Sequence, residues 1–580
     1  MPRASPPARH LLPVPPPPRH RRTLSSTFVD ESVAAAEALV QKWHPDTPDT
    51  SLFLHSDDHR AFLRAVADLH RAMLFFASDV ANNDGHGGLV QAQALLQTAM
   101  RRLDLELQLL LDHVQDHHDD ATCSSGIRAV ADAMMAAGYG KECVSTFKSR
   151  RRGALAATLH RLLGFSLPAS GIGSQFQKLT WEQVDANIIQ SWLAAAPVAF
   201  SSVFAMEKEL CDTAFANDAA VAEAVFAAVA NDHAANLLAV AEAGVARARR
   251  APERLFRVLD VHDALTQALP AILSVFGDSS EVSARAAAVL AKVGEAARGT
   301  LASFEAAIQK EPSKATASGG GVHPLTRYVM NYLVFLADYE DALALIYQQQ
   351  PVASGSVSPD LSASYSSSSS SSSPSMSPSW SPIGRLVSVL VSKLESKAGS
   401  YREVALSYLF LANNTHYVVN KVRGSSRLQG IVGDEWAEAQ AAKARGHVDV
   451  YVRAAWGKVL AAITMPSSSS RGSHGGVEEA VMEAVAAQEQ WVAADDDMGE
   501  ALRVAATAAV VPKYRMFYRR HGATVRLTPG DVTTMIAALF GGPRAQGATA
   551  MAASAARGCT TKLLQLQTED PTSRTQQLLA

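Results

Sequence analysis

Cysteine is scarce in this chain, which has four cysteines among 580 residues. None of them stands at CxxC spacing, and four thiols in so long a chain do not form a disulfide framework. This cysteine usage fits a reducing compartment, so we expect the protein in the cytosol. Long hydrophobic runs are also missing. No window approaches about eighteen uninterrupted apolar residues, so we expect no segment that spans a bilayer.

The motifs that mark common catalytic sites are missing too. Gly171 and Gly173 do not complete a GxGxxG, and Lys141 is followed by Glu142 rather than by the Ser or Thr of a phosphate-binding loop. Neither GxSxG nor HExxH occurs. The sequence therefore favours a protein that is not an enzyme and needs no cofactor.

One histidine cluster suggests a metal site at first sight. In DHVQDHHDD (residues 112–120), His113 and His117 stand four residues apart, a spacing that places both on one helix face. A metal site also needs a partly buried pocket in which a second shell fixes the ligands. This cluster is highly polar and ends a predicted helix, so we interpret it as a solvated helix end and expect no metal.

Few aromatic residues and much alanine characterise the composition. Hydrophobic residues make up 48% of the chain and aromatic residues only 7%. Alanine-rich segments with few β-branched residues favour helix. No convincing run of alternating strands bounded by Asn-Gly or Asp-Gly turns occurs. We therefore predict an all-α protein.

The stretch from Tyr401 to Leu460 predicts a helix, a short loop and a second helix. In its first half, apolar residues recur with a period of 3.6, and Asn413 and Asn414 fall on the opposite, polar face together with Asn420. Gly424 is predicted to end the first helix as a left-handed C-cap. The polar face carries no nucleophile and no carboxylate pair, so the stretch predicts scaffolding rather than an active site.

The residues of this stretch also carry a family resemblance. The string ALSYLFLANNTHYVV and the following LQGIVGDEW (428–436) resemble the Exo-seventy family, the seventy-kilodalton subunit of the exocyst tethering complex. The opening segment FVDESVAAAEALVQKW (28–43) is similar to the plant branch of that family. Further similar blocks follow in the family's order at residues 181–195, 204–215, 255–276, 322–343 and 490–520.

This resemblance implies both a fold and a function. The fold is an elongated rod of stacked helical bundles, a right-handed array of hairpins. The function is tethering of secretory vesicles to the plasma membrane in exocytosis, by a cytosolic protein that attaches peripherally to that membrane. Other exocyst subunits are the implied partners, small GTPases are further candidates, and nucleic acid is not expected.

Composition shifts predict the domain boundaries. The first 28 residues contain five arginines and no acid, which also suits an organelle transit peptide, but four consecutive prolines favour a disordered tail. A Ser-rich tract cannot bury apolar surface and is predicted to be a disordered insert. The predicted parts are a Pro/Arg-rich tail (1–27), an N-terminal helical region (28–170), the Exo-seventy-like domain (171–565) with its insert (352–381), and a flexible C-terminus (566–580).

A basic segment near the C-terminus is the sharpest candidate site. Seven Lys and Arg residues stand against one acid, Asp531, between residues 503 and 544, whereas the whole chain has a net charge of −3. Pro512 is predicted to begin a helix. A cationic surface of this kind attracts anionic membrane, although a charge run is also commonly a solvated helix face. The predicted membrane-binding residues are Lys513, Arg515, Arg519, Arg520 and Arg526.

The resemblance adds a ligand and an open alternative. Family members bind phosphatidylinositol bisphosphate through the C-terminal tip, usually with a lysine-rich Lys-Tyr-x-Lys-Tyr segment after the part that matches Tyr514 to Arg520. This chain has HGATVRLTPGD there, with Arg526 as its only Lys or Arg. The departure favours a rival hypothesis, a diverged interaction scaffold that has left the exocyst, for instance in defence signalling.

Two further patterns have plain structural interpretations. KSRRR (148–152) is typical of nucleic-acid binding or nuclear import, but the chain is acidic overall, so we interpret it as a basic face at a helix end. Five tryptophans fall on apolar stripes and are predicted to lie in the core: Trp181, Trp192, Trp436, Trp456 and Trp491.

Overall fold

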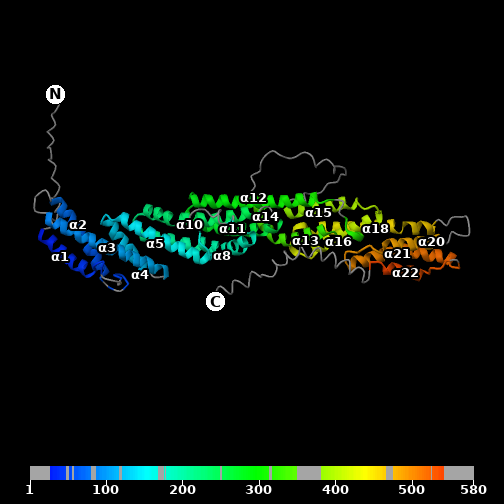
Figure 1. Cartoon of the computed structure of the whole chain (residues 1–580), viewed down its shortest axis with the longest axis horizontal. Coiled ribbons are helices and arrows are strands. Elements are labelled where there is room, and N and C mark those ends of the chain that lie inside the picture. Colours follow the sequence, from blue (N-terminus) through cyan, green and yellow to red (C-terminus); the bar gives the residue numbers. More distant parts are fainter. Residues whose placement is uncertain are drawn as a thin grey trace, which may run out of the picture. The chain divides into compact units, whose positions relative to one another are not determined.

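The computed structural model describes most of the chain, namely residues 26–46, 51–54, 56, 58–79, 86–116, 121–167, 176, 178–248, 251–312, 316–348, 381–464, 475–523 and 525–540. These residues form helices and connecting loops, with no strand among them (Figure 1). The all-α prediction is confirmed for this part. The predicted tail, apart from Ser26 and Thr27, the predicted insert, apart from Ser381, and the predicted flexible C-terminus lie outside the described residues.

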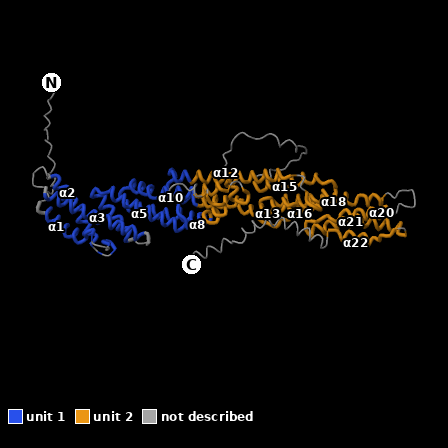
Figure 2. The backbone as a smooth tube through the Cα atoms, viewed as in Figure 1, with its two compact units in different colours: residues 1–174, 190–239, 268–285 blue, residues 175–189, 240–267, 286–580 orange. Residues whose placement is uncertain are grey.

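The chain forms two compact units that interleave along the sequence (Figure 2). Unit 1 contains residues 1–174, 190–239 and 268–285, and unit 2 contains residues 175–189, 240–267 and 286–580. Three long helices therefore pass from one unit to the other: α10 (Ala219–Ala248), α11 (Leu255–Phe276) and α12 (Glu281–Lys310). The predicted division at residue 170 stays a prediction.

Unit 1 is built from helices that pack on one another in chain order. Its central helix, α3, contacts the helices before and after it. Buried Glu106 of α3 accepts hydrogen bonds from the Ser51 hydroxyl and the Phe53 N–H, which fixes the loop between the first two helices. The elements that lie wholly in unit 1 are α1 (Ser26–Lys42), α2 (His59–Asp79), α3 (His86–Asp116), α4 (Ala121–Ala136), α5 (Gly140–Leu163), α8 (Gln190–Val198), η3 (Ala199–Val203) and α9 (Phe204–Ala214).

The basic run 148–152 lies in the middle of α5, so its predicted position at a helix end is wrong. Each of its arginines has an acidic partner. Arg150 pairs with Asp112 at 3.3 Å, and the ends of Arg151 and Arg152 pair with Glu207 and Asp232. The partners come from helices far away in the sequence, which is why the pattern of α5 alone did not reveal them.

Two apolar stretches are long enough to cross a membrane by length and composition, Trp181–Ala214 and Ala219–Ala248. They also serve as packing helices. The Trp192 side chain is buried, and its indole N–H donates to the Leu237 carbonyl at 2.8 Å, which joins α8 to α10 within unit 1. Core helices of globular proteins commonly pass the same test, so the two stretches are weak evidence for a membrane span.

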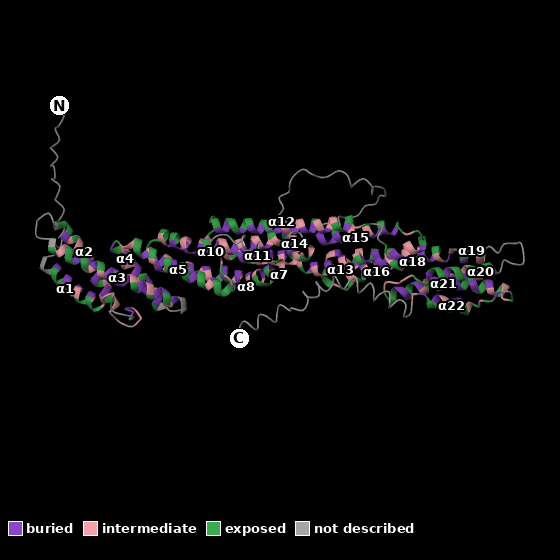
Figure 3. Ribbon diagram, viewed as in Figure 1, coloured by how far each residue is buried: buried purple, intermediate pink, exposed green. Residues whose placement is uncertain are grey.

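Unit 2 holds the C-terminal helices, whose buried residues lie on the faces that helices turn toward one another (Figure 3). Within it, α16 packs against α13, α15 and α18. The elements not yet named are α7 (Trp181–Val184), η2 (Asp185–Ile189), η4 (Pro252–Arg254), η5 (Ser318–Gly320), α13 (Pro324–Leu336), η6 (Ala337–Tyr339), α14 (Glu340–Gln348), α15 (Pro382–Ala398), α16 (Val404–Arg423), α17 (Ser426–Val432), α18 (Asp434–Ala455), α19 (Gly457–Thr464), α20 (Gly475–Gln488), α21 (Asp496–His521) and α22 (Pro529–Ala538).

The polar face predicted for the helix after Tyr401 is not the solvent face of α16. Asn413 and Asn414 are both fully buried, with 0% of their surface exposed, whereas Val404, which the same periodicity predicts to be buried, is 61% exposed. The C-cap is different too, because Gly424 has φ −76° and is therefore right-handed. Periodicity alone treats the two asparagines as surface groups, since it ignores loops that cover a helix.

The two asparagines instead hold two loops against α16. The Asn414 carboxamide oxygen accepts from the His323 N–H at 2.9 Å and from the Thr326 hydroxyl at 2.7 Å. Asn413 donates to the Gly320 carbonyl at 2.8 Å and accepts from the Ala494 N–H at 2.9 Å. These side chains satisfy buried backbone groups that no helix or sheet serves, so the pair is a structural clasp.

The tryptophan prediction is right for two of the five residues. Trp192 and Trp456 are buried, whereas Trp181, Trp436 and Trp491 are half-buried. The indole of Trp181 carries the Arg254 guanidinium on its face, 4.8 Å from the ring centre. A half-buried indole therefore contributes here by a cation–π contact as well as by apolar packing.

Candidate membrane-binding surface

The basic segment lies on the second half of α21, a helix that begins well before it. The Asp495 carboxylate caps the helix and accepts from the Met498 N–H at 2.8 Å. The prediction that Pro512 begins a helix is wrong, because Pro512 lies inside α21. Proline costs a helix one backbone hydrogen bond. Pro512 is on the exposed side of α21, so water can hydrogen-bond to the carbonyl group that lacks its N–H donor. The buried side of the helix still packs against its neighbours.

The buried face of α21 fixes the direction of its basic face. Tyr514 and Phe517 are buried at 0% and 4% exposure, and Tyr518 is half-buried. The Tyr514 hydroxyl donates to the Leu527 carbonyl at 3.0 Å. Burial raises the pKa of Tyr514 to about 12, so the phenol is neutral at physiological pH. The remaining side chains of these turns point to solvent, among them Lys513, Arg515, Arg519 and Arg520.

Arg526, the fifth predicted residue, lies on the segment that joins α21 to α22. One carboxylate oxygen of Glu478, in α20, accepts from the backbone N–H groups of Arg526 and Leu527, the second at 2.6 Å. The Arg526 side chain is exposed. A buried neighbour, Val525, helps to hold the segment against the core of this helix group.

The side chains of the five predicted cations form no ion pair with an acid among the described residues, although the Glu478 carboxylate lies against the backbone of Arg526. Arg503, one of the seven basic residues of the segment, differs. It pairs with Glu500 at 2.8 Å and donates to the Leu539 carbonyl at 3.2 Å, so its charge is used within the fold. Arg544 lies outside the described residues. We call the surface formed by Lys513, Arg515, Arg519, Arg520 and Arg526 the basic surface.

The helix after the basic surface begins at a capping box. Thr528 caps α22, Pro529 occupies its first turn, and Asp531 completes a capping box. Asp531 accepts from the Thr528 N–H and from its hydroxyl, both at 2.8 Å, and these hydrogen bonds lower the pKa of the carboxyl group. The single acid of the segment is thus committed to a helix cap and does not pair with the basic surface.

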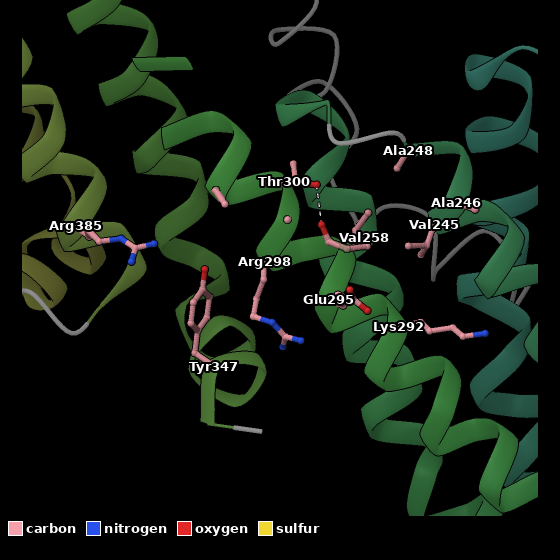
Figure 4. A pocket seen from close by; sticks show the side chains of 13 residues that line it. Val245, Ala246, Ala248, Val258, Lys292, Glu295, Arg298, Thr300, Tyr347 and Arg385 are labelled. Carbon is pink, nitrogen blue, oxygen red and sulfur yellow. Dashed lines mark hydrogen bonds between the residues drawn. The ribbon is translucent and has the colours of Figure 1, made fainter. Parts of the chain in front are cut away.

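A hollow of about 620 Å³ in unit 2 is a second place to look for a ligand (Figure 4). It lies between α10, α11, α12, α14 and α15, and three cations line it. Lys292 pairs with Glu242 at 2.5 Å, Arg385 pairs with Glu305 at 3.0 Å, and Arg298 donates to the Ile346 carbonyl at 2.9 Å. Its cations already have partners, and the lining offers no nucleophile beside a base.

The histidine cluster gives no metal site in the part of the chain that the structure describes. No group of three or more His, Cys, Asp and Glu side chains there could hold a metal ion. The helix α3 ends at Asp116, as predicted for this cluster. His117 lies outside the described residues.

Comparison with known proteins gives the family. The family model for the C-terminal part of Exo70, a component of the exocyst complex, matches residues 190–538, and the model for the Exo70 N-terminal part matches residues 32–113. Exocyst complex component EXO70C2 of Arabidopsis thaliana is 26% identical over 90% of this chain and 83% of its own length. EXO70B1 of the same plant is 31% identical over 68% of this chain and 61% of its own length.

Solved structures support the same fold. The crystal structure of the exocyst component Exo70p of S. cerevisiae aligns with a TM-score of 0.56 at 14% identity, over 89% of this chain and 100% of that one. A second structure of the yeast protein gives a TM-score of 0.59. At such low identity the likeness concerns the fold alone. The two family models and the plant relatives show that the chain belongs to the plant branch of the Exo70 family, the non-enzymatic subunits of the exocyst complex.

Proposed function

We propose that this exocyst subunit helps to tether secretory vesicles to the plasma membrane in exocytosis, and that the basic surface binds anionic phosphoinositide there. The observation that carries the proposal is the set of five exposed cations without an acidic partner among the described residues. Four of them lie within about two turns of one helix. A multivalent phosphoinositide headgroup needs such a cluster of donors on one side of a protein.

The strength of this contact follows from electrostatics. Each Lys or Arg near an anionic membrane contributes about 1 kcal/mol, and the attraction falls off within a Debye length of about 8 Å at physiological ionic strength. Five cations therefore give a reversible, salt-sensitive attachment of a cytosolic protein. Binding through several subunits of one complex raises the effective affinity, because the later contacts become intramolecular.

Other exocyst subunits are the proposed partners of the N-terminal helices. The N-terminal family model matches residues 32–113, which cover most of α1 to α3. On α3, Leu105 and Leu109 lie one turn apart and are 37% and 38% exposed. Exposed leucines on one helix face support side-by-side packing with a partner helix. Small GTPases stay candidate partners, and we assign no surface of this protein to them.

Sedimentation with vesicles tests the lipid contact. The full chain is mixed with vesicles of phosphatidylcholine alone, or with phosphatidylinositol bisphosphate added. We expect sedimentation only with the phosphoinositide, and release in high salt. The variant with Lys513, Arg515, Arg519 and Arg520 changed to Glu should stay in the supernatant, because its surface repels the anionic headgroups. Unchanged sedimentation of this variant would remove the basic surface from the proposal.

A diverged interaction scaffold, for instance in defence signalling, is the second candidate function. The segment between α21 and α22 favours it, because Arg526 is the only Lys or Arg between His521 and Asp531, where the family resemblance leads us to expect a lysine-rich sequence. Co-purification from native tissue separates the two candidates. A tethering subunit should bring down the other exocyst subunits, whereas a scaffold that has left the complex should not.

A further inference from the structure

One exposed face of α21 has a symmetric pattern of residues. Seven side chains fall within one narrow arc at the period of 3.6 residues, and all seven are exposed. We call this set the outer face of α21. Its members are Asp497, Ala501, Val504, Ala508, Pro512, Arg515 and Arg519.

The positions in the outer face are symmetric about Ala508. Val504 and Pro512 each stand four residues away from it, Ala501 and Arg515 seven, and Asp497 and Arg519 eleven. The charge, however, is opposite at the two ends, with an acid before the centre and two arginines after it. The centre is apolar, and Val504 is 56% exposed there.

The charged residues of this face are unused within the protein. Asp497, Arg515 and Arg519 form no ion pair with any described residue. Of the nearby acids, Asp495 caps α21 and Glu500 pairs with Arg503, whereas Asp496 stands next to Asp497 in the first turn. An exposed apolar centre between unpaired charges of opposite sign is typical of a surface that meets a complementary one.

We propose that the outer face of α21 binds the same face of a second copy of this chain, with the two helices antiparallel and a twofold axis at Ala508. A twofold contact requires a surface that is complementary to itself. In this arrangement Asp497 of each copy faces Arg519 of the other, and Val504 faces Pro512. Ala508 faces its own counterpart, and its small side chain lets the helices approach closely.

The proposal has two consequences for the protein. A single pair of helices makes a small interface, so the dimer is weak. It dissociates as salt screens the two pairs between Asp497 and Arg519. The dimer also covers Arg515 and Arg519, which belong to the basic surface. Self-association and attachment to an anionic membrane therefore compete, although the self-association itself does not depend on the proposed function.

Cysteine cross-linking tests the geometry directly. In a Cys559→Ser background, Ala508→Cys places one new thiol at the twofold centre, and Cys123, Cys143 and Cys211 are buried. Oxidised glutathione should convert the full chain to a covalent dimer, because a disulfide needs Cα atoms within about 7 Å. Met516→Cys is the matched control. It is exposed on the same helix, but its symmetry mate lies about 24 Å away, so it should stay monomeric.

Charge exchange tests the ionic contacts. At low salt, Asp497→Arg and Arg519→Asp should each weaken dimerisation in sedimentation equilibrium by roughly tenfold or more, because like charges then face each other. The double variant again places opposite charges across the contact and should recover the dimer. Its recovery would also show that α21 still folds with the two charges exchanged. A wild-type chain that stays monomeric at low salt, equal cross-linking at positions 508 and 516, or a double variant weaker than both single ones would overturn the proposal. Vesicle binding by a strictly monomeric chain would assign the outer face to the membrane instead.

Discussion

Two helices of this protein carry arginine-rich runs that resemble each other in sequence and differ in structure. In α5, the arginines of the run 148–152 pair with acids on other helices, and Arg151 is buried with Glu207. In α21, the cations of the basic surface face solvent without an acidic partner among the described residues. The first run joins α5 to three other helices of unit 1, whereas the second is free to bind something else.

Acids far away in the sequence therefore decide how a basic run is used. The acids that pair with α5 stand 38 to 80 residues away from their arginines. Neither net charge nor local spacing contains that information.

Removal of the buried arginine should have the largest effect. Arg151→Ala leaves the Glu207 carboxylate buried without its partner, and loss of one member of a buried pair costs about 3–5 kcal/mol. Hydrogen exchange of α5 amides in the native protein measures this change within unit 1. Two units need not unfold together, so a global melting curve is less informative.

Two controls sharpen that measurement. Arg152→Ala removes an exposed pair next to it and should cost about 1 kcal/mol or less. The double change of Arg151 to Met and Glu207 to Leu removes both charges, and should recover most of the stability, because no unpaired charge stays buried. An Arg151→Ala protein as stable as the Arg152→Ala protein would contradict our comparison.

The asparagine clasp tests whether burial, rather than charge, sets the effect of a polar residue in a helix. Asn414→Ala leaves the buried His323 N–H and Thr326 hydroxyl without their acceptor and should cost about 3 kcal/mol. The measurement is hydrogen exchange of the amides at residues 316–323. Asn420→Ala, on the exposed side of the same helix, is the matched control. Equal protection in the two variants would show that the clasp is not structural.

The cap of α22 gives the smallest effect and a pH dependence. Hydrogen bonds lower the pKa of Asp531 in the folded protein. Its contribution to stability is therefore fully present above the ordinary aspartate pKa, and it is lost as the pH falls from that value through the lowered pKa of the folded state. Asp531→Asn should therefore weaken the pH dependence of the local stability of α22 between about pH 6 and pH 3, measured by hydrogen exchange of the α22 amides relative to wild type. Thr528→Ala should cost about 1 kcal/mol at neutral pH. A steeper acid dependence in the Asn variant would reverse our assignment.

The sequence predicted the helices well, for identifiable reasons. Amphipathic period and cap chemistry are local, so the all-α fold and the capping box at Thr528 and Asp531 were both accessible. The prediction that Asn413 and Asn414 face solvent was wrong because the loops that cover them come from residues 316–323 and 492–494. Pro512 misled as well, because a proline at an exposed position of a well-packed helix does not end it.

The arginines of the α5 run have acidic partners and those of the basic surface have none among the described residues, and a vesicle assay measures the consequence of this difference. Two variants are compared with wild type on vesicles that contain phosphatidylinositol bisphosphate: Arg150→Gln with Arg152→Gln in α5, and Arg515→Gln with Arg519→Gln in α21. Both lose the same formal charge. Our account predicts wild-type sedimentation for the α5 variant and at least roughly a tenfold loss for the α21 variant. Equal loss in both, or loss only in the α5 variant, would contradict it.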